Sequence, residues 1–211
     1  MNKLSPSLLL LVVGVATSAA AAPIFSDNFN RGASNTVGNG WSEVESDAAD
    51  VSLVERGVGD QMMQVRDDDP LAIASQLSGI STLGYTNVTL SYDWQPTNNT
   101  ESGDFLWVEW RDGTLGASWN AIAHHALVGP AAFSSASTTF AAGGLGDLEF
   151  RFRVVVNANN EGANIDNVNM VGNGGDTDQR NGVPEPGTLS IAGLGMGLAA
   201  FLSRRKAIRT A

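Results

Sequence analysis

Residues 148–154 read LEFRFRV, and this stretch decides the fold class. Every second residue is apolar, and the three residues between them are Glu149, Arg151 and Arg153. Successive side chains of an extended strand point to opposite faces, so this alternation predicts one buried face and one solvated face. A strand of that kind is typical of an antiparallel sheet that packs one side on a core.

Similar short patterns recur along the chain and are separated by turns rich in Gly, Asn and Asp. Residues 105–110 (FLWVEW) are apolar on both faces, which predicts a central strand. No long amphipathic helix is predicted before the C-terminal tail. We therefore expect an all-β, antiparallel β-sandwich over residues 23–171. The further predicted strands are 41–44, 51–54, 62–66, 72–76, 90–94 and 165–171.

The charge balance restricts the possible partners. The 211 residues include 12 basic and 22 acidic side chains, for a formal net charge of −10. Such a chain is repelled by nucleic acid and is suited to solubility outside the cell or to divalent cations. The chain has no cysteine, so disulfides contribute nothing to its stability.

The N-terminus has the pattern of a secretory signal peptide. Lys3 precedes a compact apolar core at residues 8–15, and a stretch of small residues follows at 16–22. We expect residues 1–22 to direct export, with cleavage one or two residues before the Ala22–Pro23 bond. A retained N-terminal anchor is the alternative, and the short apolar core disfavours it.

The C-terminus has three parts in a fixed order. The tripeptide Pro184, Glu185, Pro186 is followed by an uncharged apolar segment that predicts a helix over 187–203, and then by the basic residues Arg204, Arg205 and Lys206. The apolar run is shorter than the ~20 residues of a standard spanning helix, and the basic cluster places its end on the cytoplasmic side.

This order closely resembles the PEP-CTERM sorting tail of exported proteins of Gram-negative bacteria. The resemblance implies that an exosortase cuts near Pro184, Glu185 and Pro186 and removes the helix. It assigns residues 183–211 to a sorting tail, behind a Gly/Asn/Asp linker at 172–182. The implied route runs through an inner-membrane intermediate to the outer envelope or the extracellular space. A permanent C-terminal membrane anchor is the alternative.

Two segments resemble the edges of jelly-roll modules of the carbohydrate-binding and concanavalin-like type. They are residues 25–29 (FSDNF) and 163–168 (ANIDNV). The resemblance implies that the first and last strands pair and that a structural calcium ion lies between them. Asp27, Asn28 and Asp166 would supply oxygen ligands. Alternatively, these three side chains cap strand ends through hydrogen bonds to the backbone.

Catalysis is not expected. Glu109 and Asp112 are three positions apart, so in an extended strand their side chains point to opposite faces. They therefore do not form the facing carboxylate pair that glycoside hydrolysis needs. His124 and His125 are the only histidines, and neighbours in a strand point to opposite faces, which argues against a paired metal site.

The expected function is that of an exported envelope or matrix protein. Resemblance to the sorted proteins implies a structural or adhesive role in exopolysaccharide or biofilm. The alternative is a carbohydrate-binding module, with Trp107, Trp110 and Glu109 as candidate ligand-binding residues, and a glycoside hydrolase is a second alternative. Trp107 and Trp110 have opposite parity, so at most one faces a given side. A carbohydrate-binding module predicts an exposed aromatic ring on a sheet face, a structural protein predicts a polar face, and core packing is the competing role for each tryptophan.

Overall fold

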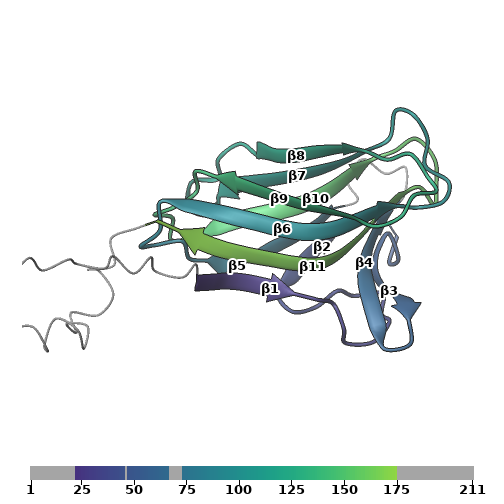
Figure 1. Cartoon of the computed structure of the whole chain (residues 1–211), viewed down its shortest axis with the longest axis horizontal. Coiled ribbons are helices and arrows are strands. Elements are labelled where there is room, and N and C mark those ends of the chain that lie inside the picture. The colour runs from purple at the N-terminus through teal and green to yellow at the C-terminus, as the bar shows by residue number, and fades with distance from the viewer. Residues whose placement is uncertain (1–21, 46, 67–72, 175–211) are drawn as a thin grey trace, which may run out of the picture.

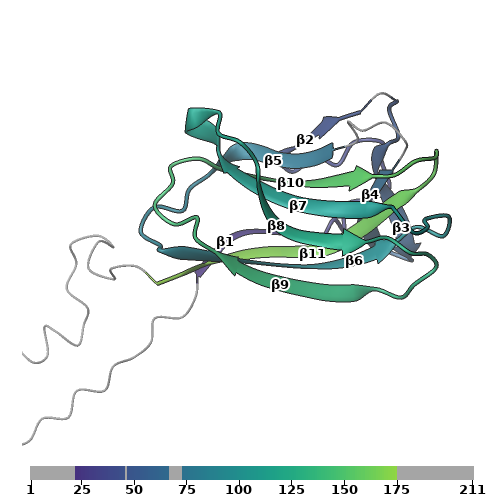
Figure 2. The ribbon, with the colours of Figure 1, turned by 90° about the horizontal axis from the view of Figure 1, so that it is seen from above.

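The computed structural model describes residues 22–45, 47–66 and 73–174, which form two antiparallel sheets packed face to face (Figures 1 and 2). The expected all-β sandwich is therefore confirmed. Residues 1–21 of the predicted signal peptide, most of the linker and the sorting tail lie outside the described residues. Among the described residues, no helix is long and apolar enough to cross a membrane.

One sheet has six strands in the order β3-β4-β11-β6-β9, with β1 paired to β11, and the other has the order β2-β5-β10-β7-β8. The chain crosses repeatedly from one sheet to the other. A 3-10 turn at Gly113–Leu115 follows β7. The strands are β1 (Ala22–Asp27), β2 (Trp41–Val44), β3 (Val51–Gly57), β4 (Asp60–Arg66), β5 (Ile73–Ile80), β6 (Asn87–Pro96), β7 (Phe105–Asp112), β8 (Asn120–Ala126), β9 (Ser134–Phe140), β10 (Leu148–Val155) and β11 (Gly162–Asn173).

The core lies between the sheets and follows the alternation in the sequence. In β10, Phe150 and Phe152 are fully buried, and they face buried residues of β6 such as Leu90 and Tyr92. Trp41 packs edge-on against Phe150, with ring centroids 5.3 Å apart. Edge-to-face geometry suits the ring quadrupoles, so this aromatic cluster stabilises the sandwich beyond its buried area.

The first and last strands pair, as the jelly-roll resemblance implies. Asp27 of β1 lies opposite Val168 of β11 in an antiparallel register. A bulge interrupts the pairing of β11 with β6 between Asp166 and Asn169, and Asn167 adopts a positive φ of 50° there. Asparagine tolerates this left-handed conformation better than most residues. The bulge shifts the side chains of β11 relative to those of its neighbour β6.

Strand β7 has the central position predicted from its two apolar faces. It pairs with β10 on one side, where Phe152 lies opposite Val108, and with β8 on the other. Its residues Leu106 and Val108 are fully buried between the sheets. The residues of opposite parity point away from the core, and they build the surface described next.

Candidate functional site

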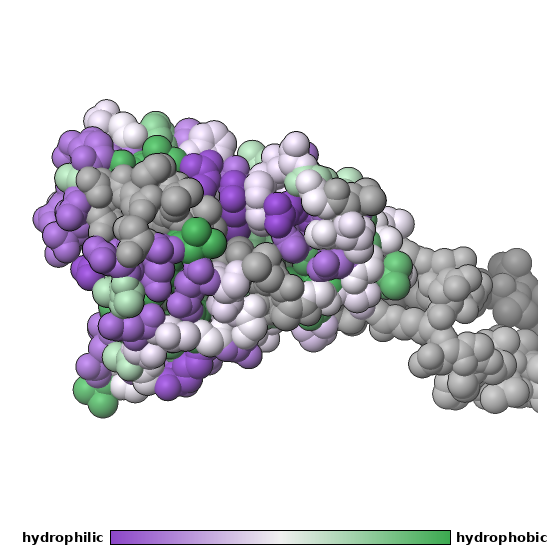
Figure 3. Space-filling model, turned by 180° about the vertical axis from the view of Figure 1, so that it is seen from behind, coloured by the Kyte–Doolittle hydropathy of each residue, from purple (hydrophilic) through white to green (hydrophobic). Residues whose placement is uncertain are grey.

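The outer side of the five-stranded sheet carries the most distinctive surface of the described chain. We call it the aromatic face. In β7 and β10, the residues that alternate with buried core residues point outward, and His124 of β8 lies opposite the outward Trp107. Figure 3 looks onto this sheet from behind and shows mainly hydrophilic and near-neutral residues, with hydrophobic ones in small separate patches. The aromatic face comprises Phe105, Trp107, Glu109, Arg111, Trp119, His124, Glu149, Arg151 and Arg153.

A row of stacked rings runs across β7 and β8. Trp107 lies opposite His124 in the strand register, and their ring centroids are 4.1 Å apart. His124 also stacks on Phe105 at 4.4 Å. His124 is exposed, and Trp107 and Phe105 are partly exposed. Residues two apart on one strand share a face, so Phe105 and Trp107 offer apolar surface to the same side.

Ion pairs surround these rings. Glu109 accepts hydrogen bonds from Arg151 Nε at 2.8 Å and from Arg153 Nε at 3.2 Å. Arg111 Nε donates to Glu149 Oε2 at 2.5 Å. Burial would raise the pKa of Glu109, but the hydrogen bonds and charges of Arg153 and Arg151 lower it, so the carboxyl stays ionised.

Trp119 joins the aromatic face from the loop before β8. The guanidinium carbons of Arg111 and Arg151 lie 4.4 Å and 4.1 Å from the centroid of its ring. These are cation–π distances, so the two arginines hold the indole against the sheet. The sequence contains no local signal for this contact, because Trp119 lies outside the strand pattern.

The structure separates the predicted ligand-binding residues. Trp107 and Glu109 lie together on the aromatic face. Trp110 has the opposite parity and packs against the core, with its ring 5.6 Å from that of Phe140. Whether Trp107, Trp110 or Glu109 contacts a ligand stays a prediction.

The two histidines point to opposite sides of β8, as strand geometry predicts. His124 lies on the aromatic face, whereas His125 turns inward, where its Nε2 is 2.6 Å from the hydroxyl of Tyr92. His125 also stacks on Trp94 at 4.3 Å. Burial of the His125 ring is the main cause that lowers its pKa, and the charge of the nearby His124 is the second. Both favour a neutral ring.

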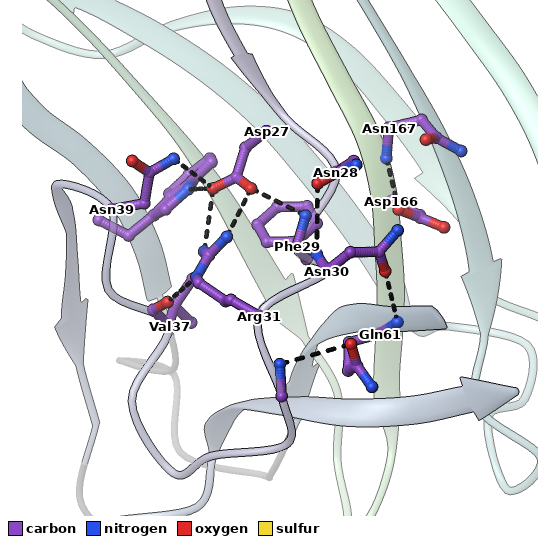
Figure 4. Close-up of polar contacts among 12 residues, drawn as sticks. Asp27, Asn28, Phe29, Asn30, Arg31, Val37, Asn39, Gln61, Asp166 and Asn167 are labelled. Carbon is purple, nitrogen blue, oxygen red and sulfur yellow. Dashed lines mark hydrogen bonds and ion pairs between the residues drawn. The ribbon is translucent and has the colours of Figure 1, made fainter. Parts of the chain in front are cut away.

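The carboxylate of Asp27, predicted to bind calcium, is surrounded by protein donors (Figure 4). Arg31 forms two hydrogen bonds to it, at 2.6 and 3.0 Å, and Trp41 Nε1 donates at 2.8 Å. The Phe29 amide and the Asn39 side chain donate at 2.8 and 3.1 Å. Burial alone would raise the pKa of Asp27, but these hydrogen bonds lower it. Asp27 therefore joins β1, the following loop and the core tryptophan.

Asp166, the second predicted calcium ligand, is also bound to an arginine. Its Oδ2 accepts from Arg56 Nη1 at 3.1 Å, and its Oδ1 accepts from the Asn167 amide at 2.7 Å. Burial raises the pKa of Asp166 despite these contacts. Asn28 is exposed, and its Oδ1 accepts from the Asn30 amide at 3.3 Å. Calcium binding by Asp27, Asn28 and Asp166 stays a prediction. A calcium ion there would compete with Arg31 for Asp27 and with Arg56 for Asp166.

An open polar cleft of about 510 Å³ lies beside Asp27, where the loop after β1 approaches the bulge of β11. Four asparagine side chains lie in its wall, so the cleft could both donate and accept hydrogen bonds. The cleft has no aromatic side chain among its lining residues, which are Ser26, Asp27, Asn28, Arg31, Asn39, Asn167, Val168 and Asn169.

Comparison with known families identifies the C-terminal tail. Residues 182–206 match the PEP-CTERM protein-sorting motif. The match includes the Pro-Glu-Pro tripeptide, the apolar segment and the basic cluster, so the predicted sorting tail is confirmed. The motif marks an exported protein that exosortase handles at the membrane. A search of curated proteins found no match to the chain.

Comparison with solved structures identifies the fold. The CBM22-1 xylan-binding domain of Paenibacillus barcinonensis Xyn10C matches with a TM-score of 0.55 at 15% identity, over 75% of this chain and 99% of that one. The CBM22-1–GH10 modules of Clostridium thermocellum Xyn10B match with a TM-score of 0.53 at 18% identity, over 74% of this chain and 29% of that one. The K3 cleaved adhesin domain of Lys-gingipain from Porphyromonas gingivalis W83 matches with a TM-score of 0.50 at 13% identity, over 72% and 99%.

These identities are low, so the likeness concerns the fold alone. The chain has the β-sandwich architecture of carbohydrate-binding modules, and it is joined to a PEP-CTERM sorting motif.

Proposed function

We propose that this exported protein binds a polysaccharide through the aromatic face of its five-stranded sheet. The observation that carries the proposal is the row formed by Phe105, Trp107 and His124. These three rings lie in contact on an outer sheet face, and none of them is buried in the core.

The chemistry of the aromatic face suits a sugar polymer. The apolar C–H side of a pyranose ring stacks on an aromatic ring, and its hydroxyls need hydrogen-bond partners at the rim. Arg153 lies over Trp107, with its guanidinium carbon 5.8 Å from the ring centroid, and Glu109 lies beside it. Three arginines against two glutamates also give this face a local positive excess on a chain of net charge −10. That excess favours a polysaccharide with acidic groups.

The sorting motif indicates where in the cell envelope the protein would bind a polysaccharide. Exosortase would act at Pro184, Glu185 and Pro186, and the domain would then be delivered to the outer envelope or the medium. Polysaccharide binding would hold it in the exopolysaccharide or biofilm matrix, which gives the structural or adhesive role a physical basis. Carbohydrate-binding modules of the same architecture, among them a xylan-binding domain, support the proposal through their fold.

Affinity electrophoresis tests the proposal. The protein is run through gels that contain xylan, a neutral glucan or a uronate-rich polysaccharide. We expect at least one polysaccharide to retard it, and we expect Trp107→Ala to weaken the binding about tenfold, since tenfold corresponds to about 1.4 kcal/mol of lost stacking. Thr139→Ala, on the outer side of the six-stranded sheet, is the matched control and should bind normally.

Two results would contradict the proposal. One is that none of the polysaccharides retards the protein. The other is that Thr139→Ala loses as much affinity as Trp107→Ala. Thermal unfolding of each variant distinguishes lost contacts from lost fold.

A further inference from the structure

Three acidic side chains meet at one end of the sandwich. The loop between β6 and β7 contributes Glu101 and Asp104, and the loop between β10 and β11 contributes Glu161. One side-chain oxygen from each of the three lies within 4.8 Å of the others. Both loops lie at the end of the sandwich remote from the start of β1 and the end of β11 (Figure 1). This cluster, Glu101, Asp104 and Glu161, is hereafter the acidic triad.

Two members of the acidic triad are buried. Asp104 is 1% exposed and Glu161 is 3% exposed, whereas Glu101 is exposed. Burying a carboxylate is costly unless a counter-charge or hydrogen bonds compensate it. Asp104 Oδ1 is buried and has no hydrogen-bond partner among the described residues. Buried polar atoms are almost always satisfied, so this oxygen calls for a ligand.

Two other oxygens of the acidic triad accept backbone hydrogen bonds, and Glu101 Oε1 accepts one from the Asn157 side chain at 3.3 Å. Asp104 Oδ2 accepts from the Glu101 amide at 2.8 Å. Glu161 Oε2 accepts from the amides of Ala158 at 2.9 Å and Asn157 at 3.3 Å. These contacts pre-orient two carboxylates from two loops toward one point, and they leave Asp104 Oδ1 free.

Within the described part of the chain, no arginine or lysine forms an ion pair with the acidic triad. The ion pairs found among the described residues involve none of its members, whereas Glu109, Asp27 and Asp166 each pair with an arginine. Three carboxylates at this separation repel one another unless a cation lies between them. The missing partner is therefore a positive charge.

We propose that the acidic triad binds a calcium ion. Calcium is a hard cation that takes about six to eight oxygen ligands at roughly 2.3–2.6 Å, so two of its ligands can lie up to about 5 Å apart. Magnesium, with ligands at roughly 2.0–2.1 Å, spans only about 4.2 Å. Water would complete the coordination on the exposed side of Glu101. The site is separate from Asp27, Asn28 and Asp166.

The position of the acidic triad gives the ion a structural task. β6 belongs to the six-stranded sheet and β7 to the five-stranded sheet, and β10 and β11 are divided in the same way. Each loop therefore passes from one sheet to the other. An ion shared by Glu161 and Asp104 clamps both crossings at one end of the sandwich.

Isothermal titration with calcium chloride tests the site on the full chain, purified in mild detergent and treated with EDTA. We expect one calcium ion per chain and weaker binding of magnesium. Asp104→Asn and Glu161→Gln should weaken calcium binding at least about tenfold, because each removes a charged ligand and even changes outside the ligand shell cost about 10–100-fold. Glu101→Gln, at an exposed position, should also weaken binding and should leave the fold intact.

Two controls place the ion. Asp166→Asn removes the sequence-predicted ligand, and Glu55→Gln removes an exposed acid elsewhere; neither should change the calcium affinity. Absence of calcium binding by the wild-type chain would overturn the proposal. So would full binding by Glu101→Gln and Asp104→Asn, or loss of binding in Asp166→Asn alone.

Thermal unfolding provides a second readout. In EDTA, Asp104→Asn should unfold at a temperature no lower than the wild type, since it relieves repulsion within the acidic triad. With calcium, the wild-type midpoint should rise and that of Asp104→Asn should not. An equal rise in both proteins would contradict the assignment.

Discussion

The outer surface of β7, β8 and β10 on one sheet differs in chemistry from the outer surface of β6 and β9 on the other. On the five-stranded sheet, stacked rings and arginine–glutamate pairs cover β7, β8 and β10. On the six-stranded sheet, most outward residues in the paired part of β6 and β9 carry hydroxyl groups, with Asp93 beside Ser135, and Thr89 and Thr139 share a hydrogen bond of 2.6 Å across the strands. Ser91 and Ser137 form the next pair in the same register.

This difference separates packing from recognition. Both sheets bury an apolar face against the core. Core packing therefore does not account for the difference between the two outer surfaces. Hydroxyl groups on a strand satisfy one another and water, and they offer no ring on which a sugar can stack. The aromatic face keeps costly groups, such as Glu109 at 8% exposure, next to partly exposed rings. Stability alone does not require that arrangement, which is why we place the binding function there.

The largest loss of stability is expected in the core, where the two sheets pack against each other. Phe152 of β10 is fully buried and lies edge-on to Tyr92 of the six-stranded sheet at 5.2 Å. Phe152→Ala should lower the free energy of unfolding by about 3–5 kcal/mol through lost burial and a new cavity. Urea unfolding measures this change. A loss below about 1 kcal/mol would mean that the sheets do not pack as described.

An intermediate effect is expected at the ion pairs of the aromatic face. Glu109→Gln leaves Arg151 and Arg153 without their shared counter-charge. We expect the free energy of unfolding to fall by about 2 kcal/mol. This loss is smaller than that for breaking a fully buried ion pair, because the two arginines are partly exposed. Asp93→Asn is the matched change on the other face, where Ser135 and Asn167 donate to the carboxylate. We expect urea unfolding to show a smaller loss there, and an equal loss would remove the contrast between the faces.

The pH dependence of stability tests the ion pairs of the aromatic face separately. The pKa of Glu109 is lowered from its ordinary value of 4.5, so the folded state binds a proton less readily than the unfolded chain. The stability that Glu109 contributes is present above about pH 4.5 and is lost as the pH falls through its lowered pKa. Unfolding midpoints measured between pH 6 and pH 3 should fall less steeply for Glu109→Gln than for the wild type. Parallel curves would show that Glu109 is not stabilised as an anion.

The smallest effect is expected on the hydroxyl face. Thr139→Ala removes one exposed side-chain hydrogen bond and should change the unfolding free energy by at most about 1 kcal/mol. Differential scanning calorimetry resolves a shift of that size. A larger loss would show that the hydroxyl ladder holds β9 to β6, and it would weaken Thr139→Ala as a control.

The fold could be predicted from the alternation in a few strands. β10, β7 and β6 carry strong apolar residues at every second position, and they form the centre of the two sheets. β8 (NAIAHHA) and β9 (SSASTTF) were not predicted, because alanine, serine and threonine give little contrast between faces. Both are edge strands and are held by a single neighbour, so their sequences carry less of the core.

The site was predictable only in part, because most of its geometry is non-local. The alternation along the strand indicated that Trp107 and Trp110 point to opposite sides, but the packing of Trp110 against the core involves Phe140 of the other sheet. The contact of Trp119 with Arg151 joins a loop to a strand more than thirty residues away. The acidic triad likewise arises only when two distant loops meet.

The most direct test of the proposed binding face follows, by NMR, the indole N–H signals of the five tryptophans and the backbone amide signals during titration with a polysaccharide that retards the protein. We predict that the signals of Trp107 and Trp119 move, whereas Trp41, whose indole donates to Asp27 in the core, stays in place. Shifts confined to Thr89, Thr139 and their neighbours, with Trp107 and Trp119 unchanged, would assign binding to the hydroxyl face and contradict the account.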